Sequence, residues 1–413
     1  MQNTLEKQFQ TFKLTEEQEL LQKTVRDIAE ENFKEKAREI DKTHRFPREN
    51  FNLLGKFEMT GLILPVEYGG GGMDYVSYTI LIEEIARVCA TTSVILAVHL
   101  SLFSVPVVKF GSESVKNKYL KKLAKGELLG AFCLSEPGNG SDAAAMLTRA
   151  VNKDDHFILN GTKAWITNGS EADLYLVFAQ ADPTVGVIHE LPSNKLPQQK
   201  HKGVTAFIVE KNMPGVSFGK LEDKLGIRAS STCQVILDNV KVPKENILGN
   251  IGDGFKIAMM TLDSGRIGIA AQALGIAQGS YDLAVSYAKT REAFGKKIIT
   301  FQAIQFMLAE IATEIEAGRL LIYHSANLKD QGLKYTRQSA EAKLFCSELA
   351  SKAANKCVQI LGGYGYTTEY DAERFMRDAK ITEIYEGTSE IQRIVIASNI
   401  IKEFTSLTET NVS

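Results

Sequence analysis

The chain has 413 residues, a length that predicts two or three domains rather than one. It carries 48 Lys and Arg against 50 Asp and Glu, so its net charge is -2. This near-balance argues against nucleic acid as a bulk electrostatic partner, because phosphate binding needs a basic surplus or a basic stripe. No apolar run approaches the roughly 20 residues that cross a bilayer, so the sequence predicts no membrane span.

The cysteines and histidines show no spacing typical of a disulfide framework or a metal site. There is no Cys-x-x-Cys motif and no pair of histidines four residues apart, which predicts that the protein holds no metal and favours a reducing compartment. The first residues lack a signal pattern, and the last residues match neither a lipidation nor a peroxisomal motif. We therefore expect a soluble enzyme of the bacterial cytoplasm, with a processed mitochondrial matrix form as the alternative.

The first third of the chain, from about residue 15 to 125, has a helical period. Residues 15–18 read Thr-Glu-Glu-Gln, a capping box in which a hydroxyl and an amide satisfy first-turn N–H groups. Asp74 is a candidate cap for a later helix. Residues 65–74, which end at this aspartate, contain four consecutive glycines and predict a flexible loop.

From about residue 130 to 242 the pattern changes to short runs rich in β-branched and aromatic residues, which predict strands. Asn160-Gly161 lies between two such runs and predicts a hairpin turn, since both residues tolerate positive φ. Residues 182–203 are polar and contain three prolines, so we expect an exposed excursion between strands.

After Pro243 the helical period returns. It predicts long amphipathic helices over 254–289, 301–329, 336–361 and 389–404. The order of helices, strands and helices is not the βαβ rhythm of a dinucleotide-binding fold, and neither common glycine-rich phosphate loop is present.

Two segments of the strand region could carry a ligand. Residues 133–142 are dense in small and hydroxyl residues, which suits close approach of the backbone to a planar ligand or a simple turn between strands. Residues 163–168 hold the only tryptophan, Trp165. A lone Trp in a strand is usually core, but beside a flavin its ring could form one wall while Thr167 donates to a ring heteroatom.

Three segments of the final third of the chain each allow two interpretations when taken singly. Glu386 precedes Gly387, so a substrate could approach a carboxylate and a backbone N–H together; alternatively Ser389 caps the next helix and Glu386 is solvated. Arg291 is either a surface charge or a pyrophosphate fork. Gly362 and Gly363 form either a helix C-cap or a passage for a ligand.

Together and in this order, these segments are far more specific. The chain resembles the acyl-CoA dehydrogenase family, most of all its short-chain (butyryl-CoA) members, from about residue 14 to 404. The resemblance implies an α+β, mostly α fold: an N-terminal helical domain over 1–127, a middle β-barrel or sandwich domain over 128–242, and a C-terminal four-helix bundle over 243–413. It also implies noncovalent FAD and a homotetramer.

The resemblance assigns cofactor contacts to both halves of the chain. Ala293 departs from the family, because many relatives have a threonine hydroxyl there on the diphosphate. The residues expected around the flavin ring and ribityl chain are Phe132, Leu134, Ser135, Gly140, Ser141, Trp165, Ile166 and Thr167, with Thr388 and Glu390 completing the contacts. Those expected at the diphosphate and adenine end are Arg291, Phe294 and Gln302, with Gln359, Gly362 and Gly363 from a neighbouring subunit.

Glu386 matches the family's catalytic base. The implied reaction is α,β-dehydrogenation of an acyl-CoA thioester, in which the carboxylate removes the α-proton while the β-hydride passes to flavin N5. Desolvation would raise the pKa of Glu386 toward neutrality, and the Glu386 N–H would help stabilise the developing enolate. Some relatives place the base at the position of Gly265, which cannot serve here.

The resemblance also implies a substrate site formed by Ser141, Asp263, Arg266, Gln272, Thr382 and Gly387. Asp263 and Arg266 belong to the stretch that contacts CoA in the family. Gln272 and Thr382 match polar side chains that fill the depth of the acyl pocket in short-chain members, and His99 lies on a helix lining the same region. Room for about four carbons favours butyryl-CoA.

The resemblance names electron-transfer flavoprotein as the acceptor of the electrons. Three alternatives stay open at this point: another short or branched acyl-CoA dehydrogenase, an oxidase or reductase-direction member working with a bifurcating partner, and a non-catalytic flavoprotein or scaffold. The 182–203 excursion is longer than in close relatives, and we expect it to affect docking or assembly rather than flavin binding.

Overall fold

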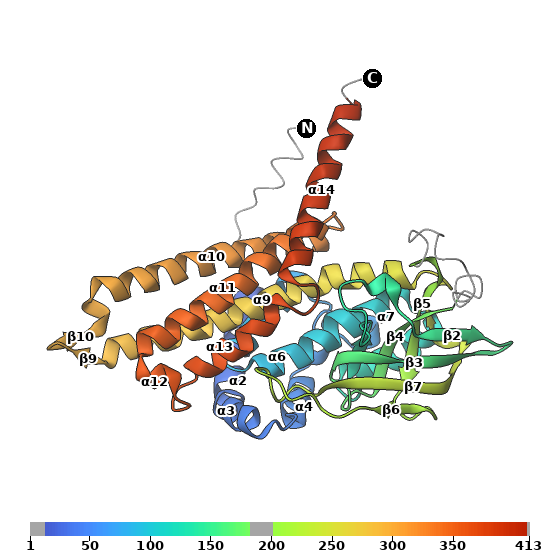
Figure 1. Ribbon diagram of the computed structural model, residues 1–413, viewed down its shortest axis with the longest axis horizontal. Coiled ribbons are helices and arrows are strands. Elements are labelled where there is room, and N and C mark those ends of the chain that lie inside the picture. The colour runs from blue at the N-terminus through green and yellow to red at the C-terminus, as the bar shows by residue number, and fades with distance from the viewer. Residues whose placement is uncertain (1–12, 182–200, 411–413) are drawn as a thin grey trace.

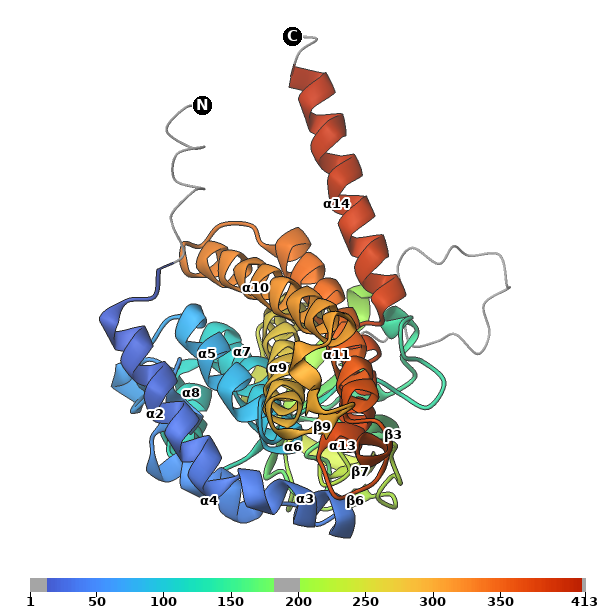
Figure 2. The same ribbon diagram turned by 90° about the vertical axis from the view of Figure 1, so that its left-hand side faces the viewer.

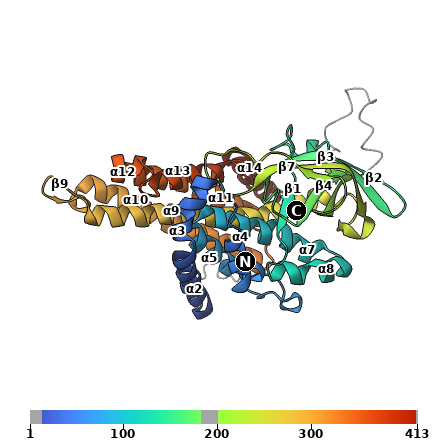
Figure 3. The same cartoon turned by 90° about the horizontal axis from the view of Figure 1, so that it is seen from below.

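The computed structural model describes residues 13–181 and 201–410. It has a helical N-terminal part, a sheet, and a bundle of long helices, which lie along one axis with the sheet at one end (Figure 1). Seen from below, the bundle and the sheet again occupy opposite ends (Figure 3). The predicted α+β, mostly helical fold is confirmed. The expected domain boundaries stay a prediction, and strand β8 extends the sheet to Leu248.

The N-terminal helices begin where the caps predict. Thr15 and Gln18 form both hydrogen bonds of the capping box, and Asp74 accepts from Ser77 N at 2.7 Å. The predicted flexible loop at 65–74 is wrong in part, because it contains a 3₁₀ turn and its glycine N–H groups donate to carbonyls of residues 61–66. The elements are α2 (Glu16–Asn32), α3 (Lys34–Thr43), α4 (Arg48–Lys56), η1 (Met59–Gly61), η2 (Val66–Tyr68), α5 (Tyr75–Ala86), α6 (Ala90–Ala97), η3 (Val98–Ser104), α7 (Val105–Phe110) and α8 (Glu113–Ala124).

Helices α6, η3 and α7 form one continuous rod, Ala90–Phe110, that passes through the protein interior. The rod is apolar and long enough to cross a membrane, but 78 % of its apolar 18-residue window is buried inside the protein, so its length and composition are those of a core helix. Its middle part, η3, winds as a π-helix. There His99 is fully buried: its Nε2 lies 3.2 Å from the carbonyls of Thr60 and Leu123, and its Nδ1 accepts from Gly130 N at 3.3 Å. His99 thus joins helices to the first strand. The expectation that its helix lines the acyl pocket stays a prediction.

The middle part is one sheet in which β6, β7, β3, β2, β4, β5 and β8 follow in order, with β1 parallel to β4. The predicted hairpin at Asn160-Gly161 is wrong, because both residues lie inside the long strand β3 at a bulge against β7. Glycine is needed there because the backbone lies close to Thr148: a Cβ on Gly161 would lie 2.5 Å from Thr148 Oγ1. The strands are β1 (Gly130–Cys133), β2 (Arg149–Asn152), β3 (His156–Thr167), β4 (Leu174–Gln180), β5 (Val204–Glu210), β6 (Val216–Phe218), β7 (Thr232–Pro243) and β8 (Ile247–Leu248), with 3₁₀ turns η4 (Ala143–Ala145) and η6 (Lys244–Asn246).

The C-terminal helices match the predicted ranges closely. Their elements are α9 (Gly254–Thr290), β9 (Glu292–Ala293), β10 (Lys296–Lys297), η7 (Ile298–Thr300), α10 (Gln302–Asp330), α11 (Thr336–Leu361), α12 (Gly363–Tyr366), α13 (Ala372–Lys380), η8 (Ile381–Glu383) and α14 (Ser389–Thr410). The 182–203 excursion falls almost entirely outside the described residues, so its expected effect on docking stays a prediction.

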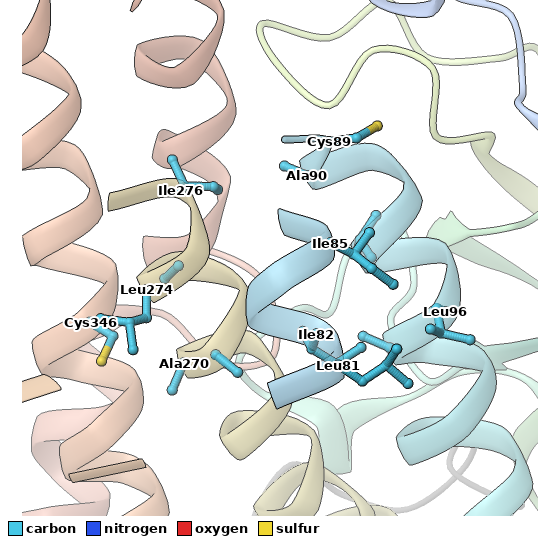
Figure 4. Packing of buried hydrophobic residues seen from close by; sticks show 14 of the residues in the cluster. Leu81, Ile82, Ile85, Cys89, Ala90, Leu96, Ala270, Leu274, Ile276 and Cys346 are labelled. Carbon is cyan, nitrogen blue, oxygen red and sulfur yellow. The ribbon is translucent and has the colours of Figure 1, made fainter. Parts of the chain in front are cut away.

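The largest apolar core joins the two helical parts across α9. Leu81 and Ile85 of α5 and Leu96 of α6 lie on one side of it, and Leu274 of α9 faces Cys346 of α11 on the other (Figure 4). All five cysteines are buried and free. This packing fixes α9 between α5 and α11, and the candidate site lies along α9.

Candidate active site

Glu386 lies in the connection between η8 and α14, where two successive residues take a left-handed backbone conformation. φ is 52° at Glu386 and 94° at Gly387. Such a conformation costs a non-glycine residue about 1–3 kcal/mol, so the surrounding structure must hold it. Two buried side chains do so: Lys343 Nζ donates to the Gly387 carbonyl at 2.7 Å, and Gln392 Nε2 donates to the same oxygen at 2.8 Å. The turn therefore fixes the direction of the Glu386 side chain.

The Glu386 carboxylate lies against helix α9 at Gly265. A Cβ built on Gly265 would lie 2.0 Å from Glu386 Oε2 and 2.7 Å from Leu102 Cδ2 of the π-helix. Only a residue without a side chain leaves space for the carboxylate there. Positions 265 and 386 are the two considered above for the base. A side chain at either position would therefore occupy the same place in the site.

The environment of this carboxylate is dry. Glu386 is partly exposed as a residue, yet its Oε2 is buried and has no hydrogen-bond partner among the described residues. Burial raises the pKa of Glu386 from 4.5 to about 8, while the positive charges of Lys343 and Arg266 oppose the rise. The alternative in which Glu386 is a solvated residue before a helix cap is therefore wrong. A carboxyl with a pKa near neutrality and a free oxygen is suited to accept a proton.

Arg266 follows Gly265 on α9 and is held by its neighbours. Its Nη1 donates to Asp263 Oδ1 at 2.6 Å, and Thr336 Oγ1 donates to Asp263 Oδ2 at 2.7 Å. Arg266 Nε is buried with no partner among the described residues. Burial lowers the pKa of Arg266 and raises that of Asp263, each against the charge of the other. The structure places Arg266 near Glu386, and Asp263 joins this site through its ion pair with Arg266.

Gln272 lies two turns farther along α9, and both polar atoms of its amide are hydrogen-bonded. Its Nε2 donates to the Ala90 carbonyl at 2.9 Å, and its Oε1 accepts the Tyr385 hydroxyl. Thr382 is also buried and donates to the Ala379 carbonyl at 2.7 Å. Tyr385 was not predicted from the sequence, although its place directly before Glu386 could have suggested a part in the pocket.

The predicted flavin-facing residues gather at the ends of β1 and β3. Trp165 lies at a second bulge in β3, with φ of 60° and 63 % of its surface exposed, so the usual interpretation of a lone Trp as core is wrong. Phe132 packs edge-on against Phe178. The neighbouring predicted residues range from buried Leu134 and Ile166, through half-buried Ser135 and Thr167, to exposed Gly140 and Ser141.

A buried ion pair joins these two segments, and sequence reasoning missed it. Lys163 Nζ of β3 lies 2.8 Å from Glu136 Oε1 and donates to the Leu134 carbonyl at 3.2 Å. Glu136 also accepts the N–H groups of Leu147 and Thr148 at 2.6 and 2.9 Å. Both charged residues stand inside the two motifs quoted above, and this was the available signal. The pair fixes the 133–142 segment against the strand that carries Trp165.

The expected diphosphate and adenine residues lie at the other end of the protein. Phe294 occupies the tip of the β9–β10 hairpin with φ of 52° and is 95 % exposed, and the Arg291 guanidinium lies over the Tyr364 ring at 5.9 Å. Figures 1 and 3 show this hairpin at the end of the long axis opposite the sheet. The single chain does not bring the two groups together. The members of the far group, all exposed, are Arg291, Phe294, Gln302, Gln359, Gly362 and Gly363.

Thr388, rather than Ser389, caps helix α14. Its Oγ1 accepts from Ile391 N at 3.3 Å, and its carbonyl accepts from Gln392 N. The alternative in which Ser389 is the cap is wrong, and the Ser389 hydroxyl has no partner in the described part of the chain. Glu390 is exposed at the helix start, where hydrogen bonds lower the pKa of its carboxyl. Within residues 13–181 and 201–410 no cluster of His, Cys, Asp or Glu could hold a metal ion.

Comparison with known protein families identifies the family of this chain. Family models match residues 15–127, 131–240 and 252–401 as the N-terminal, middle and C-terminal domains of acyl-CoA dehydrogenase. The chain belongs to the acyl-CoA dehydrogenase family.

Curated members of the family resemble this chain over nearly its whole length. It is 49 % identical to the short-chain specific acyl-CoA dehydrogenase of Clostridium acetobutylicum, over 95 % of this chain and 100 % of the relative. It is 48 % identical to the mitochondrial short-chain specific enzyme of Rattus norvegicus, over 96 % of this chain and 93 % of the relative.

Solved structures agree. Butyryl-CoA dehydrogenase from Megasphaera elsdenii superposes with a TM-score of 0.90 at 42 % identity, covering 95 % of this chain and 100 % of the other. A structure described as the electron transferring flavoprotein of Acidaminococcus fermentans, from work on flavin-based electron bifurcation, gives a TM-score of 0.90 at 47 % identity, covering 95 % and 99 %.

This acyl-CoA dehydrogenase uses FAD, and its residues fit that cofactor. The exposed Trp165 and the open backbone at Gly138 and Gly140, where an added Cβ would meet nothing within 4 Å, leave space for a planar ring at the end of β3. Gly362 and Gly363 are equally open at the far end of the bundle. Both groups of residues therefore present surfaces that an extended dinucleotide can reach.

Proposed function

We propose that this enzyme oxidises short-chain acyl-CoA thioesters, with butyryl-CoA preferred, and that Glu386 is the base that removes the α-proton. The observation that carries the proposal is the unpaired, buried Oε2 of Glu386, held against Gly265. An ordinary exposed carboxylate is too weak a base for a thioester α-proton. Burial brings the pKa of Glu386 to about 8, which narrows the difference between the pKa of the base and that of the thioester α-proton.

The same turn offers a group for the opposite charge. The Glu386 N–H has no acceptor among the described residues, so it is free to donate to a thioester oxygen as negative charge develops there. A preorganised donor in a dry site is worth about 3 kcal/mol of transition-state stabilisation. FAD, when bound, would take the hydride from the β-carbon. The residues proposed around its ring are those at the ends of β1 and β3, together with Thr388 and Glu390.

Gln272 and Thr382 support the preference for short chains. Both are buried polar side chains whose hydrogen bonds are made inside the protein, and Tyr385 ties Gln272 to the loop of Glu386. Extending an acyl chain into this network would break hydrogen bonds that the chain cannot replace. The short-chain names of the relatives from Clostridium acetobutylicum and Rattus norvegicus support the same preference.

We also propose a homotetramer in which FAD bridges copies of the chain. The two groups of cofactor residues lie at opposite ends of one chain, so a neighbouring copy must supply the second group (Figures 1 and 3). Helix α14 projects from the bundle (Figure 2) and carries Ile394, Ile401 and Phe404, each more than half exposed. An isolated helix with exposed apolar residues is stabilised when a second copy covers it.

Electron-transfer flavoprotein is the acceptor that we propose, in the bacterial cytoplasm. The similarity to the structure described as an electron transferring flavoprotein from work on bifurcation supports this partner and gives weight to a second candidate, the same chemistry run in the reductase direction. Steady-state rates of butyryl-CoA oxidation and crotonyl-CoA reduction, each with the partner flavoprotein present, distinguish the two directions.

The deciding experiment is anaerobic mixing of the yellow holoprotein with C4, C5, C6 and C8 acyl-CoA. We expect bleaching of the flavin band to be fastest with C4, and the Glu386→Gln variant to bind the thioester yet stay oxidised. Prompt reduction of that variant would overturn the assignment of the base. Fastest bleaching with C8 would overturn the chain-length assignment alone.

A further inference from the structure

Lys343 of helix α11 is a buried cation close to Glu386. The reaction proposed above assigns it no role. The whole residue is inaccessible to solvent. Its Nζ donates to the Gly387 carbonyl at 2.7 Å, and it forms no ion pair with a carboxylate among the described residues. Burying an ammonium group with a backbone carbonyl as its acceptor is costly, since the charge loses its hydration. Burial accordingly lowers the pKa of Lys343 from 10.5 to about 8.

We propose that Lys343 is a positioning residue for Glu386: its ammonium holds the left-handed Glu386–Gly387 turn through the Gly387 carbonyl, and its charge favours the ionised form of the Glu386 carboxylate. The inference rests on the proposed function, because it assigns Lys343 to the same base.

The hydrogen bond and the charge act on different parts of the turn. The Gly387 carbonyl accepts from both Lys343 and Gln392, so two donors from α11 and α14 clamp one oxygen in a backbone conformation that costs energy. The charge acts through space on the carboxylate. Among the charges near Glu386, that of Lys343 opposes the effect of burial most strongly.

The other groups facing Glu386 cannot replace this charge. Arg266 on α9 also favours the ionised carboxylate, but Asp263 lies 2.6 Å from its guanidinium and offsets part of its charge. The π-helix contributes the apolar Leu102. Tyr78 on α5 and Tyr385 in the same loop are neutral phenols, and burial raises the pKa of both. Glu383 on η8 and Glu390 at the start of α14 act on Lys343 itself, and their negative charges favour its charged form.

Three substitutions separate the two effects. Lys343→Gln keeps a donor and removes the charge, Lys343→Met removes both, and Lys343→Arg keeps both. Lys352→Gln is the matched control, because Lys352 is on the same helix but exposed and paired with Glu314. Each holoprotein is mixed anaerobically with butyryl-CoA between about pH 6 and pH 10, and the rate of flavin reduction is fitted to find its acidic limb.

Removing the positive charge makes ionisation of Glu386 harder, so its pKa rises and the acidic limb moves to higher pH. We expect a move of about one pH unit in Lys343→Gln, which is a tenfold loss of rate on the acid side with little loss at the plateau. Lys343→Met should show the same move and a lower plateau, because the turn is also released. Lys343→Arg and Lys352→Gln should keep the wild-type limb.

A second measurement reports on the carboxyl without turnover. The infrared band of the protonated Glu386 carboxyl, identified by its absence in Glu386→Gln, should persist to higher pH in Lys343→Gln than in the wild type. An unchanged limb and an unchanged band in Lys343→Gln would overturn the charge effect. If Lys343→Gln does not fold, a shifted band in Lys343→Arg would overturn it equally. Prompt flavin reduction by Glu386→Gln would instead overturn the proposed base, and so separates failure of the proposed function from failure of this inference.

Discussion

Gly265→Ala tests how closely the site depends on the space beside the carboxylate. The new Cβ would lie 2.0 Å from Glu386 Oε2, and ordinary contact begins at 3.4 Å, so the carboxylate must move by about 1.4 Å. A displacement of about 1 Å in a reacting group costs on the order of a hundredfold in rate. We therefore expect flavin reduction by butyryl-CoA, followed anaerobically by stopped flow, to slow about 100-fold at saturating substrate.

The stability of Gly265→Ala should change little. The atom in the way is the end of a flexible side chain, and alanine gains about 1 kcal/mol over glycine inside a helix. Gly279→Ala on the same helix is the matched control, because its Cβ would lie 2.2 Å from the Arg87 carbonyl, a backbone atom that cannot turn aside. That variant should melt at lower temperature by thermal denaturation, since overpacking costs about 1–3 kcal/mol, yet reduce its flavin at the normal rate. A wild-type rate in Gly265→Ala would refute the argument.

Lys163→Met should lower the melting temperature and the flavin content of the purified protein, because it leaves the Glu136 carboxylate buried without its cation, at a cost of about 3–5 kcal/mol; unchanged absorbance at the flavin band would contradict this. Gln272→Ala should shift the chain-length profile of flavin reduction from C4 toward C6 and C8, and a profile that still peaks at C4 would show that Gln272 does not limit the pocket. The melting temperature of Glu386→Gln relative to the wild type should rise from about pH 5 to pH 9: the unfolded carboxyl ionises near its ordinary 4.5 and the folded one only near 8, so the wild type loses stability over that window. Ile401→Asp should reduce the assembly measured by light scattering, and a mass of four chains in that variant would count against α14 as an interface.

Much of the helical fold could be predicted because its signals are local. The capping box at Thr15 and the break at Gly362 lie in the residues next to the helix end, and α11 begins and ends at the predicted residues. The hairpin at Asn160-Gly161 failed because turn propensity competes with strand pairing. In the folded chain β7 and β2 pair on either side of β3, and the close approach of Gly161 to Thr148 is made between β3 and the residue that precedes β2.

The candidate site divides in the same way. Glu386 and Gly387 could be singled out as one of two interpretations of their segment, and the resemblance was needed to assign Glu386 as the base and to add Arg266 and Gln272. Lys343 could not be found, because it stands 43 residues before Glu386 on a helix whose face toward the loop is set by packing. The positive φ of Trp165 arises from a bulge whose position depends on the pairing of β3 with β7, which a single sequence does not contain.

The π-helical winding of Val98–Ser104 restricts how this rod can change in evolution. A π-helical turn holds one residue more than an α-helical turn because its hydrogen bonds run from residue i to i+5, so deleting one residue there would return the stretch to α-helical winding and displace the side chains that it carries, while the helix beyond it, with buried Val107, could stay in place. His99 would then lose its place between Thr60, Leu123 and the first strand, and Leu102 would leave Gly265. Insertions and deletions among natural homologues should therefore avoid this stretch, while substitutions that keep its length are tolerated more easily.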